Sequence, residues 1–165
     1  MAIKNALIPE WENEMKSTRK MLERVPFEKA DWKPHAKSMS LGRLATHVAE
    51  IPNWLTVTLE TDELDFAKGY TQNKPANKEE LLKLFDECAS KSTEVLKNAT
   101  DENFMSNWTM RNGDKIYFTM PKVAVARNFA FNHLYHHRGQ LSVYLRLLEV
   151  PVPGMYGPTA DEGNM

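Results

Sequence analysis

Helical periodicity dominates this sequence and limits the folds open to it. Apolar residues recur every three or four positions through most of its length, so that they gather on one face of an α-helix. Each such segment predicts an amphipathic helix that buries its apolar face against others. We therefore expect an all-α protein, a four-helix bundle formed by residues 1–165 as a single domain. The four segments are residues 8–25, 40–55, 77–96 and 119–148.

Local signals place the ends and breaks of these helices. Ser40 is a good N-cap for the second helix, and Asn77 followed by Glu80 predicts a capping box at the start of the third. Pro52 lies inside the second segment and removes one backbone hydrogen bond, at a cost of about 3 kcal/mol in a helix interior. We therefore expect a kink at this proline.

A different pattern precedes the last helix. In NWTMRNGDKIYFTM, the pair Asn112-Gly113 between β-prone residues predicts a short β-hairpin insertion. Thr119 with Pro121 then opens the last helix, which ends at Leu148. At 1.5 Å per residue such a helix is roughly 40 Å long, enough to run the height of a bundle.

Composition excludes several classes of partner. A net charge of −1 and a pI of about 6.5, with no basic segment interleaved with aromatic residues, argue against nucleic acid. No apolar stretch approaches the roughly 20 residues that a membrane span needs, and the first residues are not a signal peptide. A single cysteine, Cys88, fits a reducing compartment. These features predict a cytoplasmic protein with no nucleic acid and no membrane among its partners.

Three histidines have the helical phase of a shared site. His133 and His137, in FNHLYHHRGQLSVYLRLLE, are four residues apart and continue the apolar stripe of the last helix, and His47 lies on the apolar face of the second. His136 lies about 100° around the helix from His137 and is interpreted as a surface or interface residue. His35 lies in a connection and is not counted as a ligand. We expect His47, His133 and His137 to converge in the core.

Three neutral imidazoles on facing helices predict a mononuclear metal site with only nitrogen ligands. Neither HExxH nor the Glu-x-x-His motif of di-iron bundles occurs. Such a site keeps the +2 charge of the ion and at least one open coordination position, as catalytic centres do, and it could activate a water or a substrate thiol. Ligation requires neutral imidazoles, so we expect metal affinity to fall as the pH drops through about 6.5 and below.

Other residues near these histidines have open interpretations. Arg43 and Arg138 could attract an anionic substrate, although solvated surface arginines are the simpler prediction. Gly139, costly in a helix by about 1 kcal/mol, suggests close helix approach or clearance for a ligand. No obvious general base lies near the expected ligands, because Glu50 is one turn from His47 but its phase leaves open whether it shares their face. The tail around Tyr156 is expected on the surface, with folding back across the bundle near the histidines as the alternative.

Three segments together resemble the DinB family, the damage-inducible family of small bacterial helical proteins: LGRLATHVAEIPNW, HLYHHRGQLSVYLR and PVPGMYGPTADE. The resemblance extends to WKPHAKSMSLG and thus over nearly the whole chain. It implies a four-helix bundle, usually a homodimer, in which three histidines hold a divalent metal, most often zinc or nickel. Carried onto this sequence, the ligands are His47, His133 and His137.

The resemblance also suggests a reaction. Members of the wider superfamily are thiol S-transferases and isomerases that use low-molecular-weight thiols such as bacillithiol or mycothiol. We therefore expect a metal-dependent enzyme that transfers such a thiol to a small-molecule acceptor. The alternatives are a metal-dependent hydrolase, a non-catalytic metal-binding stress-response protein, and a helical bundle whose histidines are merely polar core residues.

Overall fold

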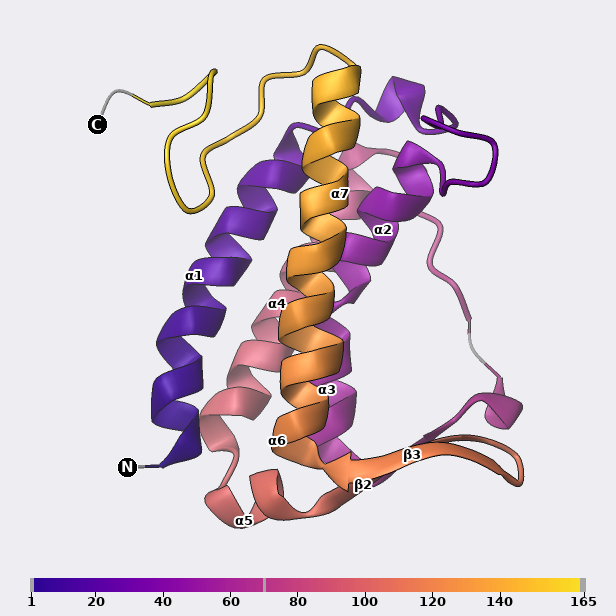
Figure 1. Cartoon of the computed structure of the whole chain (residues 1–165), viewed down its shortest axis with the longest axis vertical. Helices are drawn as coiled ribbons and strands as arrows, with labels where there is room; N and C mark the ends of the chain where they lie inside the picture. Colours follow the sequence, from indigo (N-terminus) through magenta and orange to yellow (C-terminus); the bar gives the residue numbers. More distant parts are fainter. Residues whose placement is uncertain (1, 70, 164–165) are drawn as a thin grey trace.

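The computed structural model describes residues 2–69 and 71–163, and most of them are helical (Figure 1). The mostly helical class expected from the sequence is confirmed. The α-helices are α1 (Ile3–Glu23), α2 (Leu41–Glu50), α3 (Pro52–Glu60), α4 (Lys78–Asn98), α5 (Asp101–Met105), α6 (Lys122–Val125) and α7 (His133–Leu147). The remaining elements are the 3-10 helices η1 (Phe27–Lys29) and η2 (Phe66–Lys68), the π-helical segment η3 (Ala126–Asn132), and the strands β1 (Glu63–Asp65), β2 (Asn107–Asn112) and β3 (Lys115–Pro121).

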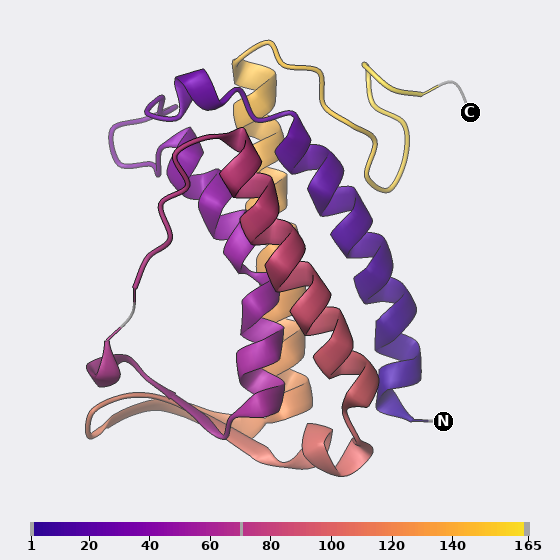
Figure 2. The ribbon, with the colours of Figure 1, turned by 180° about the vertical axis from the view of Figure 1, so that it is seen from behind.

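The long helices pack side by side around one apolar core. Helix α4 contacts α1, α2 and α3, while α7 contacts α2 and α1 on the other side, as Figures 1 and 2 show from opposite directions. Trp11 of α1 is completely buried; its indole lies 4.8 Å from the ring of Phe131, and Nε1 donates to Ser92 Oγ at 3.2 Å. Burying large apolar side chains of this kind contributes about 1.5–3 kcal/mol each.

Pro52 divides the second predicted helix instead of merely bending it. Ser40 caps α2 as expected, because its hydroxyl accepts from the backbone N–H of Arg43 at 3.3 Å. Ile51 joins α2 to α3 in helical conformation, and Pro52 occupies the first turn of α3. The missing N–H of a proline costs little there, because the first turn has no partner for it. Helices α2 and α3 therefore follow one another almost without a break, and we call them the α2–α3 column. His47 lies on its first helix and Trp54 on its second.

The expected hairpin belongs to a sheet of three strands, and the prediction of a hairpin alone is corrected. Strands β2 and β3 pair antiparallel around a two-residue turn that begins at Gly113, where φ is +57° as such turns require. Strand β1 adds to β2 in parallel, and Asp65 Oδ1 accepts from the N–H of Gly113 at 2.9 Å. Strand β1 has only three residues, two of them acidic, and therefore shows no strand pattern from which it could be predicted.

The last helix begins later than predicted and is not uniform. Thr119 is a β3 residue opposite Thr109, with the two hydroxyl oxygens 2.9 Å apart, so it cannot cap the helix. The helical run starts at Lys122, passes through the π-helical segment η3, and continues as α7. Helix α5, which the sequence did not predict, has its N-cap at Thr100.

Candidate metal centre

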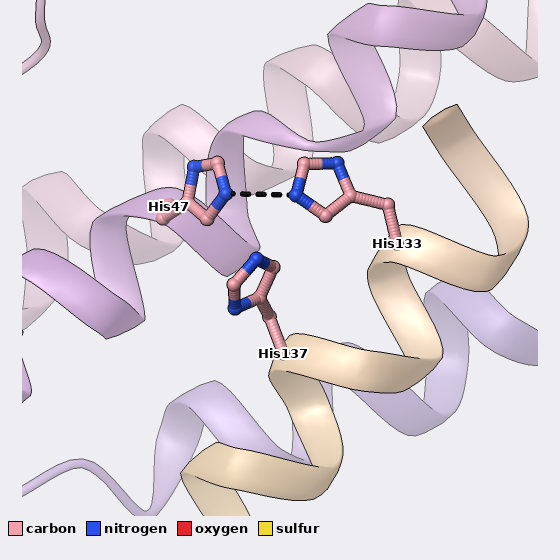
Figure 3. A group of neighbouring side chains, drawn as sticks. All are labelled: His47, His133 and His137. Carbon is pink, nitrogen blue, oxygen red and sulfur yellow. Dashed lines mark hydrogen bonds between the residues drawn. The ribbon is translucent and has the colours of Figure 1, made fainter. Parts of the chain in front are cut away.

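Helices α2 and α7 bring His47, His133 and His137 together. Figure 3 shows the three rings converging from the two helices. His47 Nε2 lies 3.1 Å from His133 Nε2, and one potential ligand atom from each of the three residues lies within 4.8 Å of the others. The ring centroids are 4.5 to 4.9 Å apart. The spatial convergence expected from helical phase is therefore present.

The Nδ1 atoms of the two α7 histidines contact groups three or four residues away, in η3 and in α7. His133 Nδ1 lies 3.4 Å from the carbonyl oxygen of Phe129, and His137 Nδ1 lies 2.8 Å from Gln140 Oε1. A proton on Nδ1 can be donated in both cases, which leaves the Nε2 lone pairs facing the cluster. Such second contacts fix ring orientation at metal sites. Sequence reasoning missed Gln140 in this role, although its spacing of three residues from His137 places the two on neighbouring turns.

All three imidazoles are held in the neutral form. Burial lowers the pKa of His47 to about 3, and the neighbouring His137, His133 and Arg43 act in the same direction. Burial also lowers the pKa of His133 and that of His137, while their contacts with Phe129 and Gln140 oppose the shift. Neutral imidazole is the form that binds metal. Proton competition therefore starts at a lower pH than the value of about 6.5 expected for unperturbed histidines.

The donor set fits a divalent cation. Tetrahedral zinc with nitrogen ligands at roughly 2.0–2.1 Å keeps those nitrogens about 3.3 Å apart, and the Nε2 atoms of His47 and His133 are 3.1 Å apart, close to this value. Among the residues that the structure describes, no carboxylate or cysteine joins the cluster. His47 and His133 can share one hydrogen bond between their Nε2 atoms, whereas a shared cation would engage all three half-buried rings. The residues present thus suit an ion that accepts imidazole, without selecting among zinc, nickel, copper and iron.

The other histidines lie outside the cluster, as the sequence predicts. His136 is exposed, although its ring centroid is 4.8 Å from that of His137. His35 is exposed in the connection before α2, where its Nδ1 accepts from the N–H of Lys37 at 3.2 Å. The aromatic neighbour on the inner side is Trp54, whose ring centroid is 6.3 Å from that of His133. Nothing in the sequence pattern distinguished Trp54 from an ordinary core residue.

Arg138 is not the solvated residue that the sequence suggested. It is 2% exposed and pairs with Glu14 of α1, which is 4% exposed, at 2.5 Å. Its guanidinium also donates to Thr18 Oγ1 at 2.9 Å and to the hydroxyl of Tyr156. Arg43 is half-buried, 3.4 Å from Glu50 Oε2. Glu50 itself accepts at Oε1 from the N–H and Nδ2 of Asn73, at 3.1 and 2.8 Å.

Gly139 and the tail also differ from their simplest interpretations. A Cβ on Gly139 would meet nothing within 4 Å, so close approach of a helix within the described chain does not explain this glycine. The tail folds back over α1 and α7, where the hydroxyl of Tyr156 donates to Glu14 Oε2 at 2.9 Å. The ring of Tyr156 remains largely exposed. The tail therefore folds back as the alternative expected, but it meets the Arg138 side of α7, which faces α1, and not the side that carries the histidine cluster.

Comparison with known proteins identifies the family. The sequence profile of the DinB family matches residues 1–164. The chain belongs to the DinB family. The uncharacterized protein YrdA of Bacillus subtilis (strain 168) is 27% identical over 153 residues, which cover 92% of this chain and 87% of YrdA.

Solved structures agree with this DinB assignment. A DinB-like protein from Bacillus cereus ATCC 10987 has 26% identity and a TM-score of 0.72, over 94% of this chain and 98% of its own. A DinB-like protein from Bacillus subtilis has 18% identity and a TM-score of 0.70, over 97% and 99% of the two chains, and this likeness shows the fold alone. In the described part of this DinB protein, no helix is both long and apolar enough to cross a membrane.

Proposed function

We propose that His47, His133 and His137 together bind one divalent metal ion, zinc or nickel, and that this centre is catalytic. The observation that carries the proposal is the convergence of three imidazoles whose ligand atoms lie within 4.8 Å of one another, with no further described ligand. Three protein ligands leave a coordination position for a substrate, as in catalytic rather than structural zinc sites.

The proposed reaction is transfer of a low-molecular-weight thiol to a small electrophilic acceptor. A divalent ion supplies a Lewis acid that lowers the pKa of a thiol reaching its open position. The protein's own residues orient and insulate the centre: Phe129 and Gln140 contact the outer nitrogens, and Trp54 packs beside His133. Glu50, the carboxylate one turn from His47, is engaged by Asn73 and Arg43. A thiol and a water each lose a proton when a metal ion activates them, so this engagement of Glu50 does not decide between thiol transfer and hydrolysis.

Metal analysis of untagged protein tests the site first. The wild-type protein should carry close to one equivalent of zinc or nickel after dialysis against either ion, while His47→Ala, His133→Ala and His137→Ala should each lose most of it. His136→Ala is the matched control, because this histidine is exposed beside His137 and should not change the metal content. Equal metal in all five proteins would refute the proposed site.

Activity is tested on the loaded protein. Cysteine, glutathione, bacillithiol and mycothiol are each offered with chlorinated and epoxide acceptors, and the loss of free thiol and the formation of thioether are followed together. We expect turnover with one thiol that disappears in His133→Ala and persists in His136→Ala. Metal binding without turnover for any thiol would refute the transferase and favour a non-catalytic metal-binding role.

We also propose the finer architecture and assembly that the family suggests. The helical body is a four-helix bundle of α1, the α2–α3 column, α4 and the run from α6 to α7, and it forms a homodimer in the cytoplasm. Two apolar side chains on α7, Val143 and Leu147, are each 56% exposed and would be covered in a dimer. Light scattering should give twice the chain mass of 19.0 kDa, and Val143→Glu with Leu147→Glu should halve it if this surface is the interface. A monomeric wild-type protein would refute the dimer.

A further inference from the structure

A cavity of about 190 Å³ continues along the α2–α3 column from the histidine cluster. Residues at steps of three or four lie on one side of this column, which stays helical through its junction: His47, Glu50, Trp54 and Val57. His47 belongs to the cluster, and the other three line the cavity. The ring centroid of Trp54 is 6.3 Å from that of His133. The cavity therefore adjoins the candidate metal centre.

The cavity has an apolar floor and a polar rim, as binding sites for small molecules do. Trp54, Val57 and Leu64 are half-buried and supply most of the apolar surface. Three exposed polar residues also line it, two of them from the segment between η2 and α4 that Figure 2 shows passing outside α2 and α3: Asn53, Thr71 and Asn73. An apolar cavity of about 150 Å³ can hold benzene, so this volume suits one six-membered ring with a small substituent.

The groups that could carry charge in this cavity are already satisfied. Glu50 is 5% exposed, and its Oε1 accepts from the N–H and Nδ2 of Asn73 at 3.1 and 2.8 Å. Arg43 lies 3.4 Å from Oε2 of the same carboxylate. Burial and the nearby Glu50 raise the pKa of the Cys88 thiol to about 11, which keeps it uncharged at neutral pH. A charged ligand would therefore lose its hydration here without gaining a partner.

An uncharged aromatic ring matches these walls, because the indole of Trp54 offers an aromatic surface beside the aliphatic Val57 and Leu64. We propose that this cavity binds the uncharged aromatic body of the acceptor. The inference rests on the proposed function and adds the acceptor's class, an aromatic electrophile such as a benzyl halide. In that transfer the thiol sulfur forms a bond to the benzylic carbon, the halide leaves with the electrons of its broken bond, and the thiol proton passes to solvent.

Binding is measured by NMR titration of the metal-free full chain, so that it does not depend on the metal centre. Four probes of similar size are compared: benzyl alcohol, cyclohexylmethanol, benzylammonium and benzoate. Benzyl alcohol should bind with a dissociation constant of about 1 mM, an affinity that roughly eight non-hydrogen atoms can reach. Cyclohexylmethanol should bind several times more weakly, and both ions roughly tenfold more weakly or worse. No binding of benzyl alcohol, or equal binding of any other probe, would overturn the proposal.

Variants locate the binding. Val57→Phe should fill the cavity and abolish benzyl alcohol binding, whereas Val143→Phe, the same substitution on an exposed part of α7, should leave it unchanged. Leu64→Phe fills the cavity from the β1 side and serves if Val57→Phe does not fold. Benzyl alcohol binding that survives in a folded cavity-filled variant would refute the assignment.

Kinetics on the zinc-loaded protein separate this inference from the proposed function. With benzyl chloride as acceptor, the cavity-filled variant should raise the KM for the acceptor roughly tenfold, while the KM for the thiol and the zinc content stay unchanged. Turnover of benzyl chloride without benzyl alcohol binding would refute the cavity and leave the transferase in place. Benzyl alcohol binding in the cavity of a zinc-loaded protein that turns over no acceptor would support the ring site and refute the transferase.

Discussion

The buried ion pair between Arg138 and Glu14 permits a quantitative prediction about stability. Both side chains are nearly inaccessible, and Arg138 adds bonds to Thr18 and Tyr156. Arg138→Leu removes one charge and leaves the Glu14 carboxylate buried with Tyr156 as its remaining donor. Breaking a buried pair in this way costs about 3–5 kcal/mol. For a domain of this size, that loss lowers the melting temperature by roughly 6–20 °C.

The double variant Arg138→Leu, Glu14→Leu distinguishes the effect of an unpaired buried charge from the effect of altered side-chain packing. When both charges are replaced by apolar groups, no uncompensated charge remains, and most of the loss should be recovered. Urea unfolding of the metal-free protein measures all three variants, with Arg24→Leu as the control. Arg24 pairs with Glu162 on the surface, where such a bond contributes about 0–1 kcal/mol. A loss below about 1 kcal/mol for Arg138→Leu, or a double variant as unstable as the sum of the two single ones, would refute the argument.

Three further predictions concern pH, metal and glycine. Folding lowers the pKa of His47 from 6.5 to about 3, so its stabilising contribution is present above pH 6.5 and is lost as the pH falls towards 3. Between pH 7.5 and 4.5, the free energy of unfolding in urea should therefore decline more steeply for the metal-free wild-type protein than for His47→Gln. Zinc at 100 times its dissociation constant should raise the melting temperature by about 5–11 °C, an increase reversed by a chelator and absent in His133→Ala. Gly139→Ala should stabilise the exposed helix by up to about 1 kcal/mol in urea titrations, whereas Gly42→Ala should destabilise by about 1–3 kcal/mol, because its Cβ would lie 2.9 Å from that of Ala30.

Local chemistry explains which features the sequence could predict. The caps at Ser40 and Asn77 involve bonds to residues three positions away, and the turn at Gly113 needs its own positive φ. The histidines converge because His133 and His137 are one turn apart and both face His47 of α2, and this helical spacing is a property of the segment alone. Features of this kind do not depend on distant parts of the chain, so they can be inferred before any tertiary contact is known.

Features that depend on distant partners could not be inferred in the same way. Arg138 is predicted on the surface because charged side chains are seldom buried unless paired, and its partner Glu14 lies on α1, 124 residues away in sequence. Strand β1 could not be predicted for the same reason, because Glu63 and Asp65 become extended by pairing with the edge of β2. A cavity beside Trp54 likewise forms only where α2, α3, α4 and the segment between α3 and α4 meet.

The π-helical segment before α7 accounts for the one difference that bears on the metal centre. A strict helical period puts His133 and His137 on the same buried stripe as Ala126 and Ala130. The observed stripe continues instead from Ala130 to Leu134, because a π-helix closes its hydrogen bonds over five residues and takes more residues per turn. The two histidines therefore lie on the flank of the core, half-buried and facing α2. On the stripe itself, their nitrogens would be sealed from any substrate. On the flank they are desolvated enough to favour the neutral form and accessible enough for a small molecule to reach the ion that we propose there.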